Sequence, residues 1–122
     1  MNPGRSFREL IAWQKAMDLA EAAYRLAGQL PERERYGLWS QLTRAAASVP
    51  ANIAEGHGRQ GTREFANFVS IARGSLAELE TFVLLAERLG YATPEETATL
   101  KSLADEVGRL TTRLHQSLRS NS

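Results

Sequence analysis

The chain of 122 residues contains no cysteine. Disulfide bonds and thiolate metal sites are therefore excluded. Their absence is consistent with a reducing compartment, and we expect the protein to be cytoplasmic. A chain of this length is expected to form one domain, here residues 1–122, and to bury roughly two-thirds of its unfolded surface. That burial is enough for a hydrophobic core without covalent cross-links.

Long hydrophobic runs are also absent. The longest uninterrupted apolar run, Phe82–Ala86, is far shorter than the ~20 residues of a membrane-spanning helix. The N-terminal segment carries Arg5, Arg8, Glu9 and Lys15, and these charges leave no apolar region for a signal peptide. We therefore expect no membrane association.

Residue patterns typical of catalysis are missing. The only histidines are His57 and His115, and neither belongs to the Glu-x-x-His pair that binds di-iron centres in helical bundles. The sequence has no Gly-x-Ser-x-Gly motif and no phosphate-binding loop. An enzyme is the weakest hypothesis. We expect no catalytic residue, no cofactor, no metal ion and no small-molecule substrate.

The net charge of +1 is too small to indicate nucleic-acid binding by itself, but the charges are unevenly distributed. Residues 33–63 contain five arginines and two glutamates, whereas residues 76–106 contain seven acids and two bases. The segment 107–122 adds three arginines and no acid. Such segments are commonly solvated helix faces, and they can also steer a partner or a second copy of the chain.

Four helices are predicted from apolar residues that recur every three or four positions. The first covers about residues 6–28 and the third about 62–89, and both have a wide apolar face. The fourth, about 94–118, has one narrow stripe, which predicts a position on the outside or a frayed end. With short connections and no strand pattern, the predicted fold is all-α, an antiparallel up-down-up-down four-helix bundle.

The second predicted helix, about residues 36–57, is the most unusual. It carries an apolar stripe and a neighbouring polar stripe, and the polar one consists of Gln41, Arg44, Ser48, Asn52 and Glu55. Pro50 lies inside this pattern. Proline lacks the backbone N–H group and crowds the carbonyl group one turn earlier, so Pro50 is predicted to kink or end the helix.

Several helix ends are predicted from single residues. Gly56 and Gly58 are expected to supply the positive φ of a helix C-terminus, and Thr62 is expected to cap the next helix. Thr93 with Pro94 and the glutamate at position 96 predicts a capping box. A glycine inside the third helix, Gly74, is expected where a neighbouring backbone comes close.

Antiparallel packing predicts which polar groups lie at the same level. When two antiparallel helices are joined by a turn, the numbers of two residues that face each other add up to about twice the number of the residue at the turn. The turns are expected near residues 32 and 60. This places a polar seam along the bundle, made of Glu21, Gln41, Arg44, Ser48, Asn52, Glu55, Asn67, Arg73 and Glu78. A buried polar seam is a structural network in most proteins, and a ligand-binding role is the alternative.

Two segments, QLTRAAASVPANIAEGHGR from Gln41 and IARGSLAELE from Ile71, carry a family resemblance. Together with ELIAWQKAMDLA and LAERLGY, they resemble the bacterial four-helix-bundle proteins named after the intervening sequences of 23S ribosomal RNA. The resemblance implies an antiparallel four-helix bundle, assembly as a ring of five and a poorly defined biochemical role. A related group, the accessory variability proteins of diversity-generating retroelements, binds nucleic acid and a reverse transcriptase.

Two functions are compatible with these patterns. The first is a non-enzymatic, self-assembling scaffold or interaction module, a homo-oligomer and most simply a pentamer, with Pro50 and the polar seam near the subunit contact. Opposite charges on residues 33–63 and 76–106 suit a head-to-tail contact that closes into a ring. The alternative is an accessory protein that binds RNA or DNA through an arginine-rich surface. Its candidate residues are Arg33, Arg35, Arg59 and Arg63, with Arg44 and Arg73 in the wider set.

Overall fold

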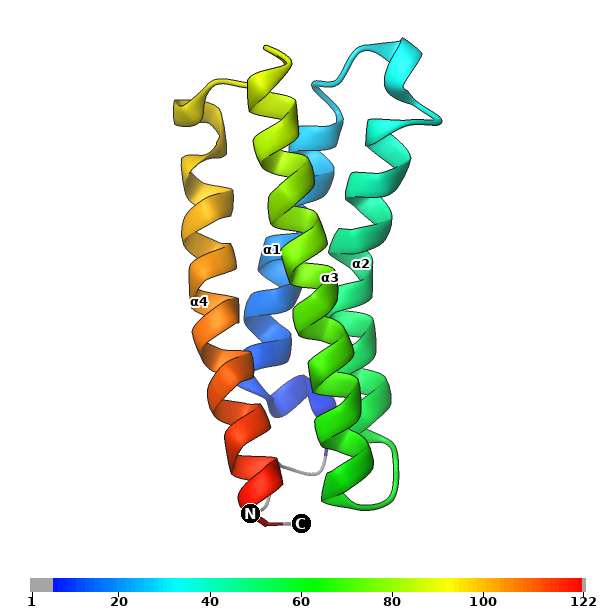
Figure 1. Cartoon of the computed structure of the whole chain (residues 1–122), viewed down its shortest axis with the longest axis vertical. Coiled ribbons are helices and arrows are strands. Elements are labelled where there is room, and N and C mark those ends of the chain that lie inside the picture. Colours follow the sequence, from blue (N-terminus) through cyan, green and yellow to red (C-terminus); the bar gives the residue numbers. More distant parts are fainter. Residues whose placement is uncertain (1–5, 122) are drawn as a thin grey trace.

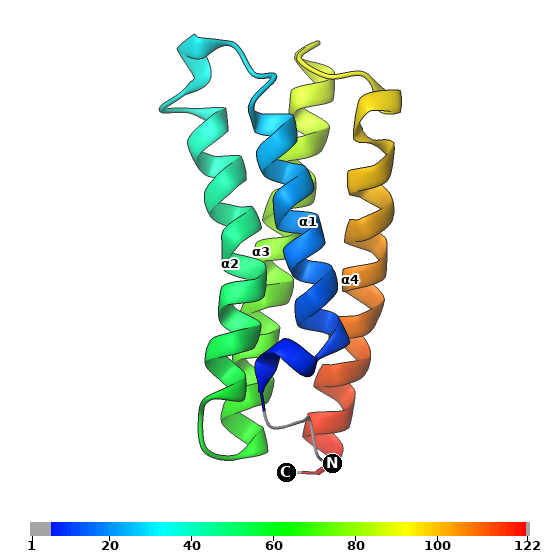
Figure 2. The ribbon, with the colours of Figure 1, turned by 180° about the vertical axis from the view of Figure 1, so that it is seen from behind.

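The computed structural model describes residues 6–121 and shows an antiparallel four-helix bundle (Figure 1). The predicted fold class is therefore confirmed. Its elements are the 3₁₀ turns η1 (Phe7–Glu9) and η2 (Glu32–Glu34) and the helices α1 (Ile11–Ala27), α2 (Leu38–His57), α3 (Thr62–Arg88) and α4 (Pro94–Ser120). Each helix packs against the next, and α4 packs against α1, as the reverse view in Figure 2 also shows.

The beginning of the first helix differs from the prediction. Ser6 accepts a hydrogen bond from the Arg8 backbone N–H and starts the separate turn η1 rather than α1. Leu10 then adopts an extended conformation with φ of −74° and ψ of 124°, which separates the turn from α1. The predicted continuous helix from residue 6 is thus divided into two pieces.

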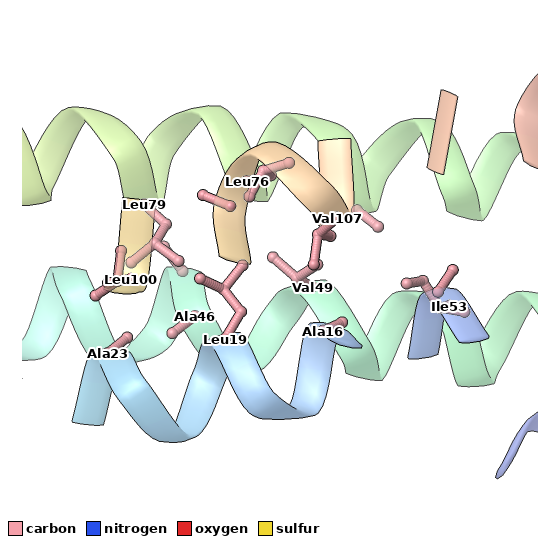
Figure 3. Packing of buried hydrophobic residues seen from close by; sticks show 14 of the residues in the cluster. Ala16, Leu19, Ala23, Ala46, Val49, Ile53, Leu76, Leu79, Leu100 and Val107 are labelled. Carbon is pink, nitrogen blue, oxygen red and sulfur yellow. The ribbon is translucent and has the colours of Figure 1, made fainter. Parts of the chain in front are cut away.

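The core lies along the axis of the bundle, where leucine and valine side chains fit against alanines (Figure 3). Leu19 and Leu79 are completely buried, and Ala16, Ala23 and Ala46 are fully buried beside them. Small residues on α1 and α2 allow the helices to approach closely, and burying each large side chain contributes about 1.5–3 kcal/mol. The packed core fixes which helix faces remain on the surface.

Helix α4 is a full member of the core. Leu118 is completely buried near its C-terminus, and the helix continues to Ser120. Two buried threonines, Thr97 and Thr111, complete its inner face. Thr111 donates its hydroxyl hydrogen bond to the Val107 carbonyl at 2.7 Å, so the polar atom is satisfied within the helix. The predicted outer position and frayed end are wrong.

Pro50 does not end α2, which continues from Leu38 to His57. The residue that brings two backbones together is Gly56, because a Cβ atom there would lie 2.6 Å from Cβ of Phe68 on α3. Gly74 was predicted to have this role, but a Cβ atom there would meet nothing within 4 Å. The backbone of α2 therefore approaches α3 closely at Gly56, near the turn that joins the two helices, and not at Gly74.

Two predictions about the turn between α2 and α3 are wrong. Gly58 has φ of −77°, so it does not adopt the positive φ expected of it. The positive φ between α2 and α3 is at Gly61, at 91°, and Gly61 rather than Thr62 occupies the capping position. Gly90 has φ of 79° and follows α3, where left-handed backbone favours glycine.

The N-terminus of α4 has the predicted capping box. The Glu96 backbone N–H donates to Thr93 Oγ1 at 3.2 Å, and the Thr93 N–H donates to Glu96 Oε1 at 2.8 Å. Nearby, the carboxylate of Glu87 on α3 accepts hydrogen bonds from Lys101 and Thr97 on α4. Lys101 first, and then Thr97, lower the pKa of the Glu87 carboxyl group.

Acidification should therefore destabilise the bundle partly through Glu87. Because its pKa is lower in the folded protein than the ordinary value of 4.5, its contribution is present above pH 4.5 and is lost as the pH falls through the folded-state pKa. We expect the urea midpoint of the wild-type protein to fall more between pH 7 and pH 3 than that of Glu87→Gln. Equal falls in both proteins would contradict this role.

Candidate interaction surfaces

The seam between α2 and α3 contains a compact polar contact. Ser48 Oγ lies 2.8 Å from Ser75 Oγ, and Asn52 Nδ2 donates to Ser48 Oγ and to the Ser48 carbonyl, each at 2.8 Å. Ser75 is buried, and the contact gives its hydroxyl group a hydrogen-bond partner. Without that partner, burial of the hydroxyl group would destabilise the fold. The structure thus brings Ser48 and Asn52 together with Ser75, which was not among the predicted seam residues.

Above this contact lies a hollow of about 280 Å³ between α2 and α3. Gln41, Arg44 and Glu78 line it with Ser48 and Ser75. Within residues 6–121 the Arg44 and Glu78 side chains form no ion pair or hydrogen bond. The predicted seam is thus partly assembled, but two opposite charges at its centre remain without partners inside the described chain.

Three other residues predicted for the seam lie elsewhere. Glu21 pairs with Arg25 on the surface of α1 at 3.2 Å. Asn67 and Arg73 line hollows between α3 and α4. Residues two positions apart on a helix differ by about 200° in direction. Because Ser75 faces α2, Arg73 must lie on the opposite side of α3.

The end of the bundle at the α2–α3 turn holds two of the predicted arginines. Arg59 Nη2 lies 2.7 Å from Glu55 Oε2, and its guanidinium lies 5.0 Å from the centre of the Phe68 ring. The hydrogen bond to Glu55 raises the pKa of Arg59 above its ordinary value. Arg59 is therefore engaged within the chain, whereas Arg63 has no partner among the described residues.

The other two predicted arginines lie at the opposite end, in the connection between α1 and α2 (Figure 1). The Arg33 guanidinium lies 5.7 Å from the centre of the Tyr91 ring. Since α2 has 20 residues, about 30 Å separates this end from Arg59 and Arg63. Arg33, Arg35, Arg59 and Arg63 therefore do not form one continuous surface.

Glu34 joins the two connections at this end. Its carboxylate accepts a hydrogen bond from the Leu38 backbone N–H at 3.1 Å and another from the Tyr91 hydroxyl at 2.8 Å. The bond from Leu38 is the largest cause of the lowered pKa of Glu34, followed by the bond from Tyr91. Glu34 thus caps α2 from the preceding turn, a role that its position in the sequence did not indicate.

Helix α3 exposes an apolar stripe beside α2. Ile71, Leu85 and Leu89 are 52%, 41% and 51% exposed, and their spacing places them on the same side of the helix as Ser75. The adjacent surface of α2 contains the exposed small residues Ala47 and Ala51. We refer to Ile71, Leu85, Leu89, Ala47 and Ala51 as the α2–α3 face. Arg44 and Glu78, whose charges have no partner within residues 6–121, lie in the hollow between the same two helices.

Residues 6–121 contain no group of three or more His, Asp or Glu side chains that could hold a metal ion. In the same part of the chain, no helix is long and apolar enough to cross a membrane.

The fold and surfaces define an up-down four-helix bundle whose most distinctive features are exposed faces and grooves. The family model of the 23S rRNA-intervening sequence protein matches residues 8–113, and the chain belongs to this family. A crystal structure of a protein of unknown function from the S23 ribosomal protein family of Bacteroides thetaiotaomicron VPI-5482 has the same fold. It aligns with a TM-score of 0.80 at 24% identity, covering 86% of this chain and 98% of that chain. No curated protein matches significantly.

Proposed function

We propose that this protein is a non-enzymatic, self-assembling scaffold whose subunits meet through the α2–α3 face. The observation that carries the proposal is the exposed stripe of Ile71, Leu85 and Leu89 beside the alanine surface of α2. Large apolar side chains that are exposed along one side of a helix favour an interaction site there. Small residues on α2 allow a neighbouring helix to approach its backbone closely.

The charges near this face support a second copy of the chain as the partner. Arg44 and Glu78 lack partners within residues 6–121, and a neighbouring subunit can supply the opposite charge to each. The arginine-rich segment 33–63 and the acidic segment 76–106 suit a head-to-tail contact, which generates a closed ring when the rotation closes. The family resemblance favours five subunits.

Light scattering at micromolar concentration tests this proposal. We expect the wild-type protein to have a mass of five times 13.5 kDa and Ile71→Glu/Leu85→Glu to approach 13.5 kDa, because burying two carboxylates at an apolar contact is strongly unfavourable. Leu84→Glu is the matched control, since Leu84 is 50% exposed on the other side of α3, where it lines a hollow against α4. A wild-type mass of 13.5 kDa would refute the proposal.

Nucleic-acid binding is the second candidate function. The predicted set of Arg33, Arg35, Arg59 and Arg63 is divided between two ends of the bundle and does not support it as one surface. A different arrangement favours it, because Arg63 lies at one end of a groove that contains further arginines from α3 and α4.

A further inference from the structure

Two hollows adjoin along the surface between α3 and α4. One, of about 750 Å³, is lined by Arg63 and His115, and the other, of about 550 Å³, is lined by Arg73 and Gln116. His115 and Gln116 are neighbours in the chain and both hollows are lined by α3 and α4, so we treat the two adjoining hollows as one groove. We call it the α3–α4 groove. At Arg73, two positions from Ile71, the groove lies on the opposite side of α3 from the apolar stripe that was assigned to self-assembly.

Four of the arginines that line the α3–α4 groove lack acidic partners among residues 6–121. Arg63 and Arg73 from α3 and Arg109 and Arg113 from α4 line it, and within residues 6–121 none of these four forms an ion pair. No aspartate or glutamate occurs in residues 65–77 of α3 or after position 106 in α4. Between these positions the two helices therefore supply no acidic residue to neutralise the positive charge of the groove.

Acidic residues lie at the end of the α3–α4 groove that is nearest the connection between α3 and α4. Glu80 and Asp105 lie where the second hollow meets a third one towards the α3–α4 connection. Burial first, and then the charge of Asp105, raise the pKa of Glu80. The opposite dipole ends of α3 and α4 meet at the lower end, where their effects offset each other. The arginines therefore determine the sign of the potential between these limits.

The geometry gives two rows of positive charge. Arg63 and Arg73 are ten positions apart on α3, as are Arg109 and Arg119 on α4, so each row extends about 15 Å. Antiparallel packing places Arg63 near the level of Arg119. A duplex strand carries a phosphate every 3.4 Å along its axis, so a row of this length spans about four phosphates.

Among the described residues 6–121, no tryptophan, tyrosine or phenylalanine lines the two hollows. Stacking on aromatic side chains is the usual means of holding single-stranded bases, and without it a groove contacts mainly the backbone. We propose that the α3–α4 groove binds the phosphate backbone of duplex nucleic acid without reading its sequence. This inference deepens the second candidate function and is independent of self-assembly through the α2–α3 face.

Fluorescence anisotropy with labelled DNA and RNA duplexes of about 20 base pairs tests the inference, with salt varied from about 50 to 200 mM. For the DNA duplex, we expect the logarithm of the association constant to fall linearly with the logarithm of salt. Arg73→Gln/Arg109→Gln/Arg113→Gln should reduce the slope by about three, because each lost phosphate contact removes nearly one unit. Its affinity at low salt should fall by about tenfold or more.

The matched control is Arg25→Gln/Arg33→Gln/Arg35→Gln, which makes the same change in net charge at the end of the bundle near the α1–α2 connection. Its salt slope should stay close to that of the wild-type protein. Binding of either duplex with this pattern supports the proposal, and the comparison identifies which nucleic acid is preferred. Equal losses in both variants, or no wild-type binding at the lowest salt, would overturn it.

Two further measurements distinguish binding to the phosphate backbone from sequence-specific binding, and duplex binding from a contact between copies of the chain. Duplexes of unrelated sequence should bind within about threefold of one another, and a strong sequence preference would contradict binding through the backbone. Light scattering on the same samples should give the groove variant the wild-type mass. If that variant instead changes mass and retains duplex binding, the groove is a contact between copies of the chain and the proposal is wrong.

Discussion

Gly56→Ala is expected to destabilise the protein by about 1–3 kcal/mol or more, the range for overpacking a tight contact. The added Cβ atom would lie 2.6 Å from Cβ of Phe68 and 3.0 Å from Cδ1 of Phe65. The Phe68 Cβ atom is fixed to the α3 backbone and cannot move away by rotation of its side chain. Relief of the clash therefore requires α2 and α3 to separate near their turn.

Gly74→Ala provides the matched control, because it makes the same chemical change inside a helix. An added Cβ atom at Gly74 meets nothing within 4 Å, so only helix propensity changes, and stabilisation by about 1 kcal/mol is expected. Urea unfolding monitored by circular dichroism measures both variants. If Gly56→Ala is as stable as the wild-type protein, the close approach of the two helices is not required for the fold.

These two glycines show where sequence analysis succeeds and where it fails. The apolar repeats of α3 follow from spacing alone, since a side chain every three or four residues must lie on one face. Spacing also placed Gly74 inside a helix and Gly56 near a helix end, as observed. Which glycine approaches another backbone depends on the rotation of each helix about its axis, and that rotation is fixed only when the helices pack.

The position of α4 was mispredicted for a related reason. Thr97 and Thr111 are completely buried, although they are polar by composition. Thr111 bonds its hydroxyl group to a carbonyl one turn earlier, which leaves its methyl group to pack like that of valine. A stripe defined by apolar residue types alone omits such threonines, so the inner face of α4 seemed narrower than it is.

The candidate surfaces were predicted in part. Ser48 and Asn52 follow from the polar stripe of α2, and their partner Ser75 could have been found from its spacing with Ile71 and Glu78. The α3–α4 groove was not predicted, because the predicted levels follow from the turns near residues 32 and 60, which join α1 to α2 and α2 to α3. The acid-free segment 107–122 was the available signal.

Leu79→Ala should have the largest effect on stability. Leu79 is completely buried on α3 near Leu100, as Figure 3 shows. Truncating a buried leucine removes its transfer free energy and leaves a cavity, which together cost about 2–5 kcal/mol. A domain of this size is stable by about 5–15 kcal/mol, so a substantial part of its stability would be lost. Urea unfolding with unchanged buffer and protein concentration measures the difference.

Leu84→Ala is the control on the same helix, because Leu84 is 50% exposed. Since less area is buried there, we expect a loss below about 1 kcal/mol. Protein concentration must be equal in all samples, because assembly stabilises folded subunits by mass action and would otherwise contribute to the comparison. If both substitutions cause equal losses, the interior of the bundle tolerates a cavity at Leu79, and the packing that orients the α2–α3 face and the α3–α4 groove is weaker than its burial indicates.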